Sequence, residues 1–198
     1  MTSVDPSESS AAPTHATSEP VAVGRVTYRA VVMGTAGSGK SLIGELLAQR
    51  LDLPFADADD FHPAANVAKM AAGTPLTDAD RQPWLESVGA WLADHPSGGI
   101  MACSALRRAY RDTLRVAVPQ LPFLHPAGKA SIVLERVAAR SEATDHFMPV
   151  SLVESQYATL EQLGDDEAGV TLDFTRTPAE LVEDCVAYLQ GRRGHSHR

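Results

Sequence analysis

Eight consecutive residues starting at Gly34 have the types and the order of a phosphate-binding loop, because they fit the pattern G-x-x-x-x-G-K-[S/T]. The glycines let the backbone turn tightly, so that successive N–H groups point inward at phosphate oxygens. We expect Lys40 to reach the β- and γ-phosphates and the Ser41 hydroxyl to bind Mg²⁺. The sequence therefore predicts a nucleoside triphosphate site formed by Gly34, Thr35, Ala36, Gly37, Ser38, Gly39, Lys40 and Ser41.

Two carboxylates follow a short way along the chain, in residues 55–63. Asp57 and Asp59 are two residues apart, so in an extended backbone their side chains project to the same side. One carboxylate can hold Mg²⁺, and the other can take the proton of a substrate hydroxyl that attacks a γ-phosphate. The alternative is a solvated acidic loop in which the aspartates cap helices. His62 either contacts substrate or caps the helix that begins at Pro63.

Strands and helices must position these groups, and the two kinds of segment alternate along the chain. Apolar runs predict strands over residues 28–33, 54–57, 99–103, 121–124 and 170–174. Helical patterns follow over residues 41–51, 63–72, 107–116 and 131–140. Alternation of this kind predicts an α/β, three-layer P-loop kinase fold, with a five-stranded parallel sheet flanked by helices and ligands at the carboxyl ends of the strands.

Three further helices are predicted from capping boxes, in which a Ser or Thr precedes an acidic residue by three positions. The pairs are Thr77 with Asp80, Ser151 with Glu154, and Thr177 with Glu180, and the last two helices should end near residues 163 and 190. After the first box, Trp84, Val88 and Trp91 recur on one helical face. We expect these three side chains in the core rather than stacked on a substrate.

The composition excludes some classes of protein. A net charge of −8 over 198 residues argues against a nucleic-acid surface, and no segment has the length of a membrane span. Cys103 and Cys185 lie far apart in the sequence, which fits a reduced cytoplasmic protein better than a disulfide framework. We expect one kinase domain over residues 27–190, with a disordered extension over residues 1–26 and a flexible tail over residues 191–198.

Several sequence blocks resemble the gluconate kinases (gluconokinases). They are residues 57–63 (DADDFHP), 80–85 (DRQPWL), 103–112 (CSALRRAYRD) and 146–149 (HFMP), and they occur in order after the phosphate loop. The resemblance covers about residues 30–189. It implies a fold close to the shikimate and nucleoside monophosphate kinases, commonly as a homodimer. It also implies transfer of the γ-phosphate of ATP to the 6-hydroxyl of D-gluconate, with Mg²⁺.

Gluconate is a polyol that ends in a carboxylate, so its site needs hydroxyl acceptors and at least one cation. Asp59 is the candidate for holding and activating the attacking hydroxyl, with Asp57 supporting Mg²⁺. The cationic candidates are Lys69, Arg81, Arg107 and Arg111, of which Arg81 and Arg107 are favoured because both lie in the family blocks at probable strand or helix ends; each arginine could instead be a solvated surface residue. Ser104, His62 and His146 are further candidates for contacts with substrate, whereas Cys103 is expected to be a small buried residue.

Residues 136–149 should form a mobile lid, because kinases of this fold bring arginines over the transferred phosphoryl group on closure. Arg140 is the candidate catalytic arginine and Arg136 the second choice. The lid departs from the family pattern. The family usually has a short basic link at this point, whereas residues 141–145 (SEATD) form a longer link that carries two acidic residues. Residues 125–129 are also irregular, and Ala58 replaces a common glycine.

Two alternatives to a gluconate kinase remain open. One is a related kinase that acts on shikimate, another sugar acid or a nucleoside monophosphate. The Asp-x-Asp pair is shared with shikimate kinases, but the residue 80–85 block is not. The other is a nucleotide-binding regulator with weak catalysis, for which the altered lid is the support.

Overall fold

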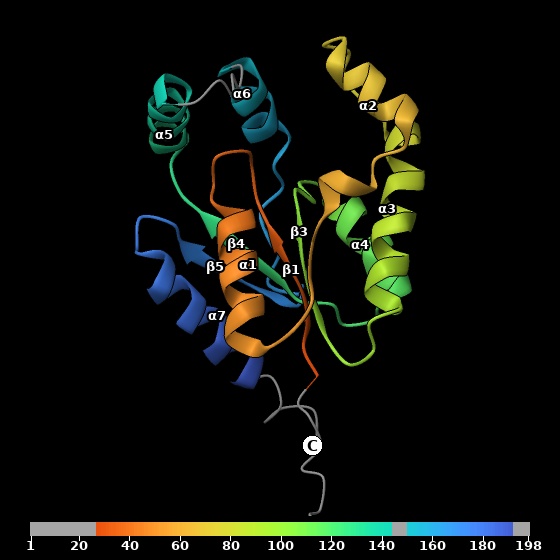
Figure 1. Cartoon of the computed structure of the whole chain (residues 1–198), viewed down its shortest axis with the longest axis vertical. Helices are drawn as coiled ribbons and strands as arrows, with labels where there is room; N and C mark the ends of the chain where they lie inside the picture. The colour runs from red at the N-terminus through yellow and green to blue at the C-terminus, as the bar shows by residue number, and fades with distance from the viewer. Residues whose placement is uncertain (1–26, 144–149, 192–198) are drawn as a thin grey trace, which may run out of the picture.

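The computed structural model describes residues 27–143 and 150–191 (Figure 1). Its strands are β1 (Arg29–Met33), β2 (Phe55–Asp57), β3 (Gly99–Cys103), β4 (Phe123–Ala127) and β5 (Gly169–Asp173). Its helices are α1 (Lys40–Leu51), the 3-10 helix η1 (Ala58–Phe61), α2 (Ala64–Ala71), α3 (Asp78–Ala93), α4 (Arg108–Ala117), α5 (Ala130–Ala143), α6 (Val150–Thr159) and α7 (Pro178–Gly191). The predicted extension over residues 1–26 and residues 192–198 of the predicted tail lie outside the described residues.

The five strands form one parallel sheet in the order β2-β3-β1-β4-β5, which confirms the predicted fold class. Strand β1 lies in the middle of the sheet, and its residues after Arg29 are fully buried. It pairs with β3 from Arg29 to Met33 and with β4 at Val31 and Val32. The phosphate loop that follows β1 is therefore held by a buried strand at the centre of the sheet.

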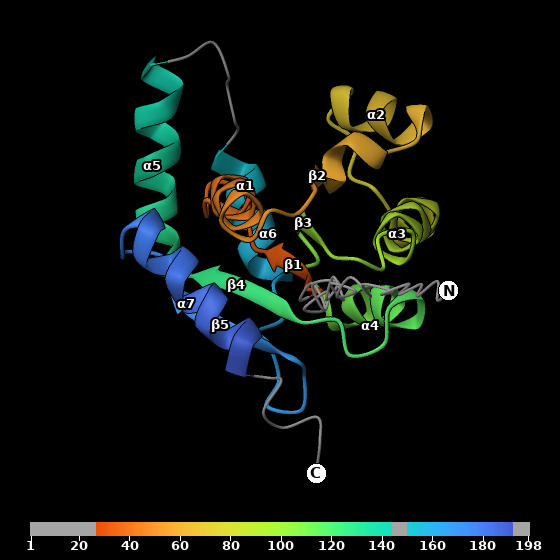
Figure 2. The same cartoon turned by 60° about the horizontal axis from the view of Figure 1, so that its bottom comes forward.

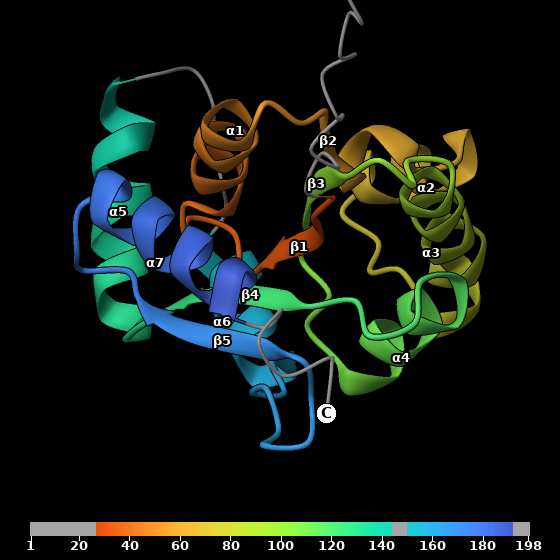
Figure 3. The ribbon, with the colours of Figure 1, turned by 90° about the horizontal axis from the view of Figure 1, so that it is seen from below.

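Helices cover both faces of the sheet because successive side chains of β1 point to opposite sides. Val31 and Met33 pack in a cluster with residues of α3 and α4. Ala30 and Val32 pack in a second cluster with residues of α1 and α7. Figures 2 and 3 show the resulting three layers, with α1 and α7 on one side of the sheet and α3 and α4 on the other.

The carboxyl ends of the strands meet at one edge of the sheet, as expected for parallel strands. The phosphate loop leaves β1 there, η1 begins directly after Asp57 of β2, and Ser104 follows β3. Helices α5 and α6 pack against each other beside this edge, through a small cluster of Val133, Val153 and Phe174. The fold thus gathers the candidate residues of the sequence at one place.

Two of the predicted capping boxes are present, and one prediction is wrong. At α3, Thr77 and Asp80 cap each other reciprocally. At α7, the Thr177 N–H donates to Glu180 at 2.9 Å. Ser151, in contrast, lies inside α6, so it cannot cap that helix, and α6 ends at Thr159 rather than near residue 163.

The fourth strand is displaced from its predicted position. The apolar run predicts residues 121–124, but β4 runs to Ala127 and includes Pro126. Pairing of β4 with β1 stops at Leu124, while pairing with β5 continues to Ala127. Beyond Leu124 the strand has a paired neighbour on one side only, and proline is tolerated in such an edge position.

Candidate active site

The backbone of the phosphate loop is shaped by three glycines with positive φ: Gly34 (148°), Gly37 (77°) and Gly39 (90°). A Cβ atom on Gly34 would lie 2.7 Å from the Ser38 Oγ, so the turn excludes a side chain there. Gly39 is the N-cap residue of α1 and has no side chain to bond the N–H groups of the first turn. The first-turn N–H groups of α1 have no intrahelical acceptors and, together with the helix dipole, form an anion-binding site.

The expected Mg²⁺ ligands are adjacent. The Ser41 hydroxyl, in the first turn of α1, donates to a carboxylate oxygen of Asp57 at 2.7 Å. Hydroxyl and carboxylate oxygens are ligands that Mg²⁺ accepts together with phosphate oxygens and water. The two side chains fit a magnesium ion bound to a nucleotide. No group of three or more His, Cys, Asp or Glu side chains that could hold a metal ion occurs in residues 27–143 and 150–191.

Asp57 and Asp59 do not project to the same side of an extended strand, and that part of the prediction is wrong. The strand ends at Asp57, and the chain turns into η1. Asp57 caps η1 by accepting the N–H of Asp59 at 3.1 Å. The capping interpretation is therefore confirmed for Asp57, whose other carboxylate oxygen stays at Ser41, where the functional interpretation requires it. Asp59 lies in the first turn of η1 and is solvent-exposed beside the Ser41–Asp57 pair.

His62 ends η1, and its ring stacks on Trp84 with centroids 4.6 Å apart. Trp84 is buried, and its indole N–H donates to the carbonyl of Ala58 at 2.7 Å. The tryptophan thus fixes the acidic segment to α3, in the core as predicted. Burial lowers the pKa of His62, which favours the neutral ring. Its Nδ1 has no hydrogen-bond partner within the described part of the chain.

Two of the predicted cations, Arg81 and Arg107, converge on one carboxylate. Arg107 Nη1 donates to both oxygens of Asp78, at 2.9 and 3.1 Å, and Arg81 lies 3.9 Å from the same group. The Tyr110 hydroxyl donates to Asp78 at 2.6 Å, and both guanidinium groups lie 5.8 Å from the Tyr110 ring centroid. The Tyr110 hydrogen bond, followed by the arginines, lowers the pKa of Asp78.

Lys69 lies apart from this arginine cluster. Its ammonium group, on α2, pairs with Asp80 of α3 at 2.6 Å, so the pair links the two helices. This hydrogen bond, with those from Thr77, lowers the pKa of Asp80 to about 2. Lys69 therefore supports the capping box of α3 in the structure.

Arg111 is buried, although the sequence suggested that it could bind substrate. Its side chain is fully inaccessible and pairs with the buried carboxylate of Glu167 at 2.7 and 2.8 Å. Its remaining donors are directed at the carbonyls of Ala105, Leu106, Glu161 and Gln162. With its donors engaged inside the protein, Arg111 is a structural residue that joins α4 to residues 161–167.

The residues after β3 lie beside the phosphate loop. The Gly34 N–H donates to the carbonyl of Ser104 at 3.3 Å, and Ser104 is partly exposed. Cys103, the last residue of β3, is fully buried, and burial raises the pKa of its thiol to about 12. The expectation that Cys103 is a small buried residue is confirmed.

The two candidate lid arginines differ in what the structure describes. Arg136 Nη2 donates to the carbonyl of Phe174 at 2.9 Å, and its guanidinium lies 4.6 Å from the Phe174 ring centroid. Arg136 thus anchors α5 to the end of β5. Arg140 lies further along α5, and nothing is described of its side chain. His146 and residues 144–149 of the predicted lid lie outside the described residues.

One contact at the phosphate loop was missed from the sequence. The Ala36 N–H donates to the side-chain oxygen of Gln156, on α6, at 2.6 Å. The two residues are 120 positions apart, and a glutamine on a polar helix has no pattern that would reveal such a contact. The same limitation applies to Asp78 and Tyr110, which order the arginine cluster.

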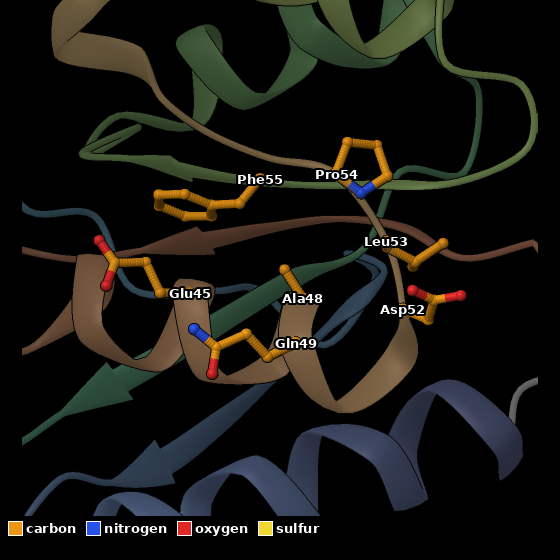
Figure 4. A pocket seen from close by; sticks show the side chains of 7 residues that line it. All are labelled: Glu45, Ala48, Gln49, Asp52, Leu53, Pro54 and Phe55. Atoms are coloured by element: carbon orange, nitrogen blue, oxygen red, sulfur yellow. The ribbon is translucent and has the colours of Figure 1, made fainter.

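A pocket elsewhere on the molecule has no connection with this site. It is lined by residues of α1 and of the segment leading into β2, which Figure 4 shows: Glu45, Ala48, Gln49, Asp52, Leu53, Pro54 and Phe55. None of these residues belongs to the phosphate loop, the acidic pair or the arginine cluster.

The described part of the chain also contains no helix long and apolar enough to cross a membrane.

A phosphate loop after the central strand of a parallel sheet, with a hydroxyl–carboxylate pair beside it, is the arrangement of the P-loop nucleotide-binding proteins, the class that includes the P-loop kinases. A sequence model of the shikimate kinase family matches residues 36–189. The gluconokinase of Gluconobacter oxydans (strain 621H) is 40% identical over 163 residues, which cover 81% of this chain and 90% of that protein. The thermosensitive gluconokinase of Escherichia coli (strain K12) is 40% identical over 159 residues, which cover 78% and 83%.

Solved structures agree with these relatives. The crystal structure of a gluconokinase from Sinorhizobium meliloti 1021 has a TM-score of 0.78 and 40% identity, and the match covers 87% of this chain and 99% of that chain. The APS kinase of Mycobacterium tuberculosis has a TM-score of 0.58 at 16% identity, a likeness of fold alone. The chain belongs to the gluconokinase family, and it is a phosphotransferase.

Proposed function

We propose that this protein transfers the γ-phosphoryl group of ATP to the 6-hydroxyl of D-gluconate, giving 6-phospho-D-gluconate and ADP. The observation that carries the proposal is the position of Asp59, one short turn beyond the Ser41–Asp57 pair at the carboxyl edge of the sheet. An acceptor hydroxyl next to Asp59 is close to the phosphate loop. The names of the relatives identify the acceptor as gluconate.

The residues of the chain divide the reaction among them. Lys40 and the loop N–H groups hold the β- and γ-phosphates, while Ser41 and Asp57 hold Mg²⁺, which when bound neutralises charge on those phosphates. Asp59 accepts the hydrogen bond of the attacking hydroxyl and takes its proton during transfer. Arg140 is the proposed cation over the transferred phosphoryl group.

The carboxylate of gluconate is proposed to bind at the arginine cluster. Arg81 and Arg107 carry donors that suit a carboxylate, and both are partly exposed. Asp78 and the Tyr110 hydroxyl hold the two guanidinium groups in place before substrate arrives. His62, Lys69, Ser104 and His146 remain proposed contacts for the hydroxyl groups of the substrate.

The test is ADP release from MgATP by the purified protein, with D-gluconate, shikimate, AMP or no acceptor. Release that depends on gluconate, with 6-phosphogluconate as the product, is the expected result. Lys40→Ala should abolish it and serves as the control for contaminating kinases. ADP release with shikimate or AMP, and not with gluconate, would show that the compound that supports release is the acceptor. Tight ATP binding with no acceptor-dependent release would identify a nucleotide-binding regulator.

The assembly and the compartment are parts of the same proposal. We infer a homodimer, which sedimentation velocity tests through the mass of the particle. Cys103 and Cys185 are both buried and free, which supports a reducing, cytoplasmic environment.

A further inference from the structure

Helix α6 is tied to the phosphate loop by a single side chain. The carboxamide oxygen of Gln156 accepts the N–H of Ala36 at 2.6 Å, which is a short N–H···O hydrogen bond. Across residues 27–143 and 150–191, this is the one side-chain contact to a backbone N–H of residues 34–41. The contact therefore joins two parts of the molecule that are distant in sequence.

The N–H groups of this loop have a different ligand when nucleotide is bound. Glycine-rich loops of this pattern direct their backbone N–H groups at phosphate oxygens. The neutral amide oxygen of Gln156 thus accepts a hydrogen bond from an N–H group that a phosphate oxygen can also accept from. The Ser38 hydroxyl, four residues from the start of the loop, is buried and has no hydrogen-bond partner among the described residues. The loop therefore still has a polar group to offer an incoming anion.

We propose that in the nucleotide-free protein the carboxamide oxygen of Gln156 occupies the position that a phosphate oxygen takes when ATP is bound. ATP binding then displaces Gln156, which releases α6 from the loop. The proposal rests on the proposed function only through the binding of ATP, not through gluconate. Phosphate displaces the carboxamide because hydrogen bonds to a charged acceptor are about twice as strong as bonds between neutral groups. The two contacts are thermodynamically linked. The hydrogen bond between Gln156 and Ala36 therefore weakens nucleotide binding by the same factor by which bound nucleotide weakens that hydrogen bond.

Other contacts keep α6 in place after Gln156 is released. The Tyr157 hydroxyl donates to the carbonyl of Gly128 at 3.2 Å, on the connection that follows β4. Val153 is fully buried against Val133 of α5 and Phe174. These contacts attach α6 to α5 and to the end of the sheet. Displacement of Gln156 therefore frees the helix from the phosphate loop while its packing on α5 remains.

The first test is the dissociation constant of MgATP measured calorimetrically, without acceptor, for the wild type and for Gln156→Ala. Removal of a competing hydrogen bond should tighten MgATP binding by about three- to tenfold. Ser155→Ala is the matched control, because the Ser155 hydroxyl bonds to Leu152 within the same helix and does not contact the loop. Unchanged or weaker MgATP binding by Gln156→Ala would overturn the proposal.

Gln156→Glu changes the competitor in the opposite direction and covers the case in which the alanine variant does not fold. A carboxylate accepts the Ala36 N–H more strongly and repels phosphate, so MgATP binding should weaken by more than about tenfold. Equal affinity in this variant would contradict the proposal.

Hydrogen exchange of the Ala36 amide, followed by NMR, reports the contact itself. In the nucleotide-free wild type this amide should exchange more slowly than in Gln156→Ala, and the Ser155→Ala control should match the wild type. Equal exchange in all three proteins would show that Gln156 does not hold the loop. These measurements use no gluconate, so a protein that binds ATP but does not phosphorylate gluconate gives the same answer.

Discussion

At the scale of single residues, the turn after β2 separates two aspartates that the sequence places side by side. Asp57 uses one carboxylate oxygen for Ser41 and the other for the N–H of Asp59. Its orientation is thereby fixed toward the position proposed for Mg²⁺. Asp59 is turned by η1 and remains exposed for a substrate. Ala58 between them is fully buried in the cluster with α3, so its methyl group is accommodated in the core.

This separation predicts that the two functions of the acidic segment can be measured apart. Asp59→Asn should lower turnover by at least about 100-fold, because the amide cannot take the proton of the attacking hydroxyl. Its affinity for MgATP should stay the same, since the Ser41–Asp57 pair is untouched. Steady-state kinetics and calorimetry measure the two quantities. Asp60→Asn, the neighbouring exposed carboxylate of η1, is the control, and normal turnover in Asp59→Asn would remove Asp59 from the reaction.

At the scale of elements, the acidic segment and the arginine cluster depend on how α3 and α4 are held. Arg111 on α4 donates to both oxygens of Glu167, whose pKa is lowered mainly by this pairing, and Arg115 shares the Oε2 atom of Glu167 at 2.7 Å. These bonds join α4 to the segment before β5. Arg107, which precedes α4, is held directly by Asp78 of α3 and does not contact this anchorage.

We predict that Arg111→Met destabilises the protein while its proposed substrate site stays intact. Loss of one partner from a buried ion pair costs about 3 kcal/mol of unfolding free energy. Urea unfolding measures the loss, and the KM for gluconate should not change in the folded variant. Arg50→Met, which breaks the exposed pair with Glu183, should cost less than about 1 kcal/mol. A large rise in KM without loss of stability would restore Arg111 as a substrate ligand.

Local patterns in the sequence were sufficient for most of these elements. The strand–loop–helix unit around Lys40 and the capping boxes at Thr77 and Thr177 depend on residues within a few positions of each other. Contacts between distant segments were not predictable in the same way. Arg111 looks like a surface arginine of a helix until residues 161–167 are folded over it, and Ser151 fits a capping pattern that also occurs inside helices.

At the scale of the whole molecule, one buried histidine makes stability depend on pH. His125, in β4, is 1% exposed, and its Nδ1 has no partner among the described residues. Burial, with the nearby charge of Arg111, lowers its pKa from 6.5 to about 4. Between these two values the unfolded chain binds a proton that the folded protein refuses. The contribution of His125 to stability is therefore zero above pH 6.5 and becomes unfavourable as the pH falls.

We predict that His125→Leu makes the protein more resistant to acid. Relative to pH 7.5, the wild type should lose about 2 kcal/mol of unfolding free energy at pH 5 through this residue alone. Urea unfolding of both proteins at the two pH values measures the difference, and the leucine variant should lack that part of the loss. Parallel pH dependence in the two proteins would mean that His125 titrates normally in the folded state.

The order of the strands separates the proposed acceptor-binding residues from the phosphate loop along the chain, and this separation affects how such a protein can evolve. Most of the residues proposed to meet the acceptor, from Asp59 to Arg107, come from one continuous stretch between β2 and α4, on one side of β1, and His146 is the exception. The phosphate loop and α6 are encoded outside that stretch. Substitutions that alter acceptor choice can accumulate in one segment of the gene while the nucleotide machinery is preserved, and recombination of that segment can exchange acceptors between relatives in a single event.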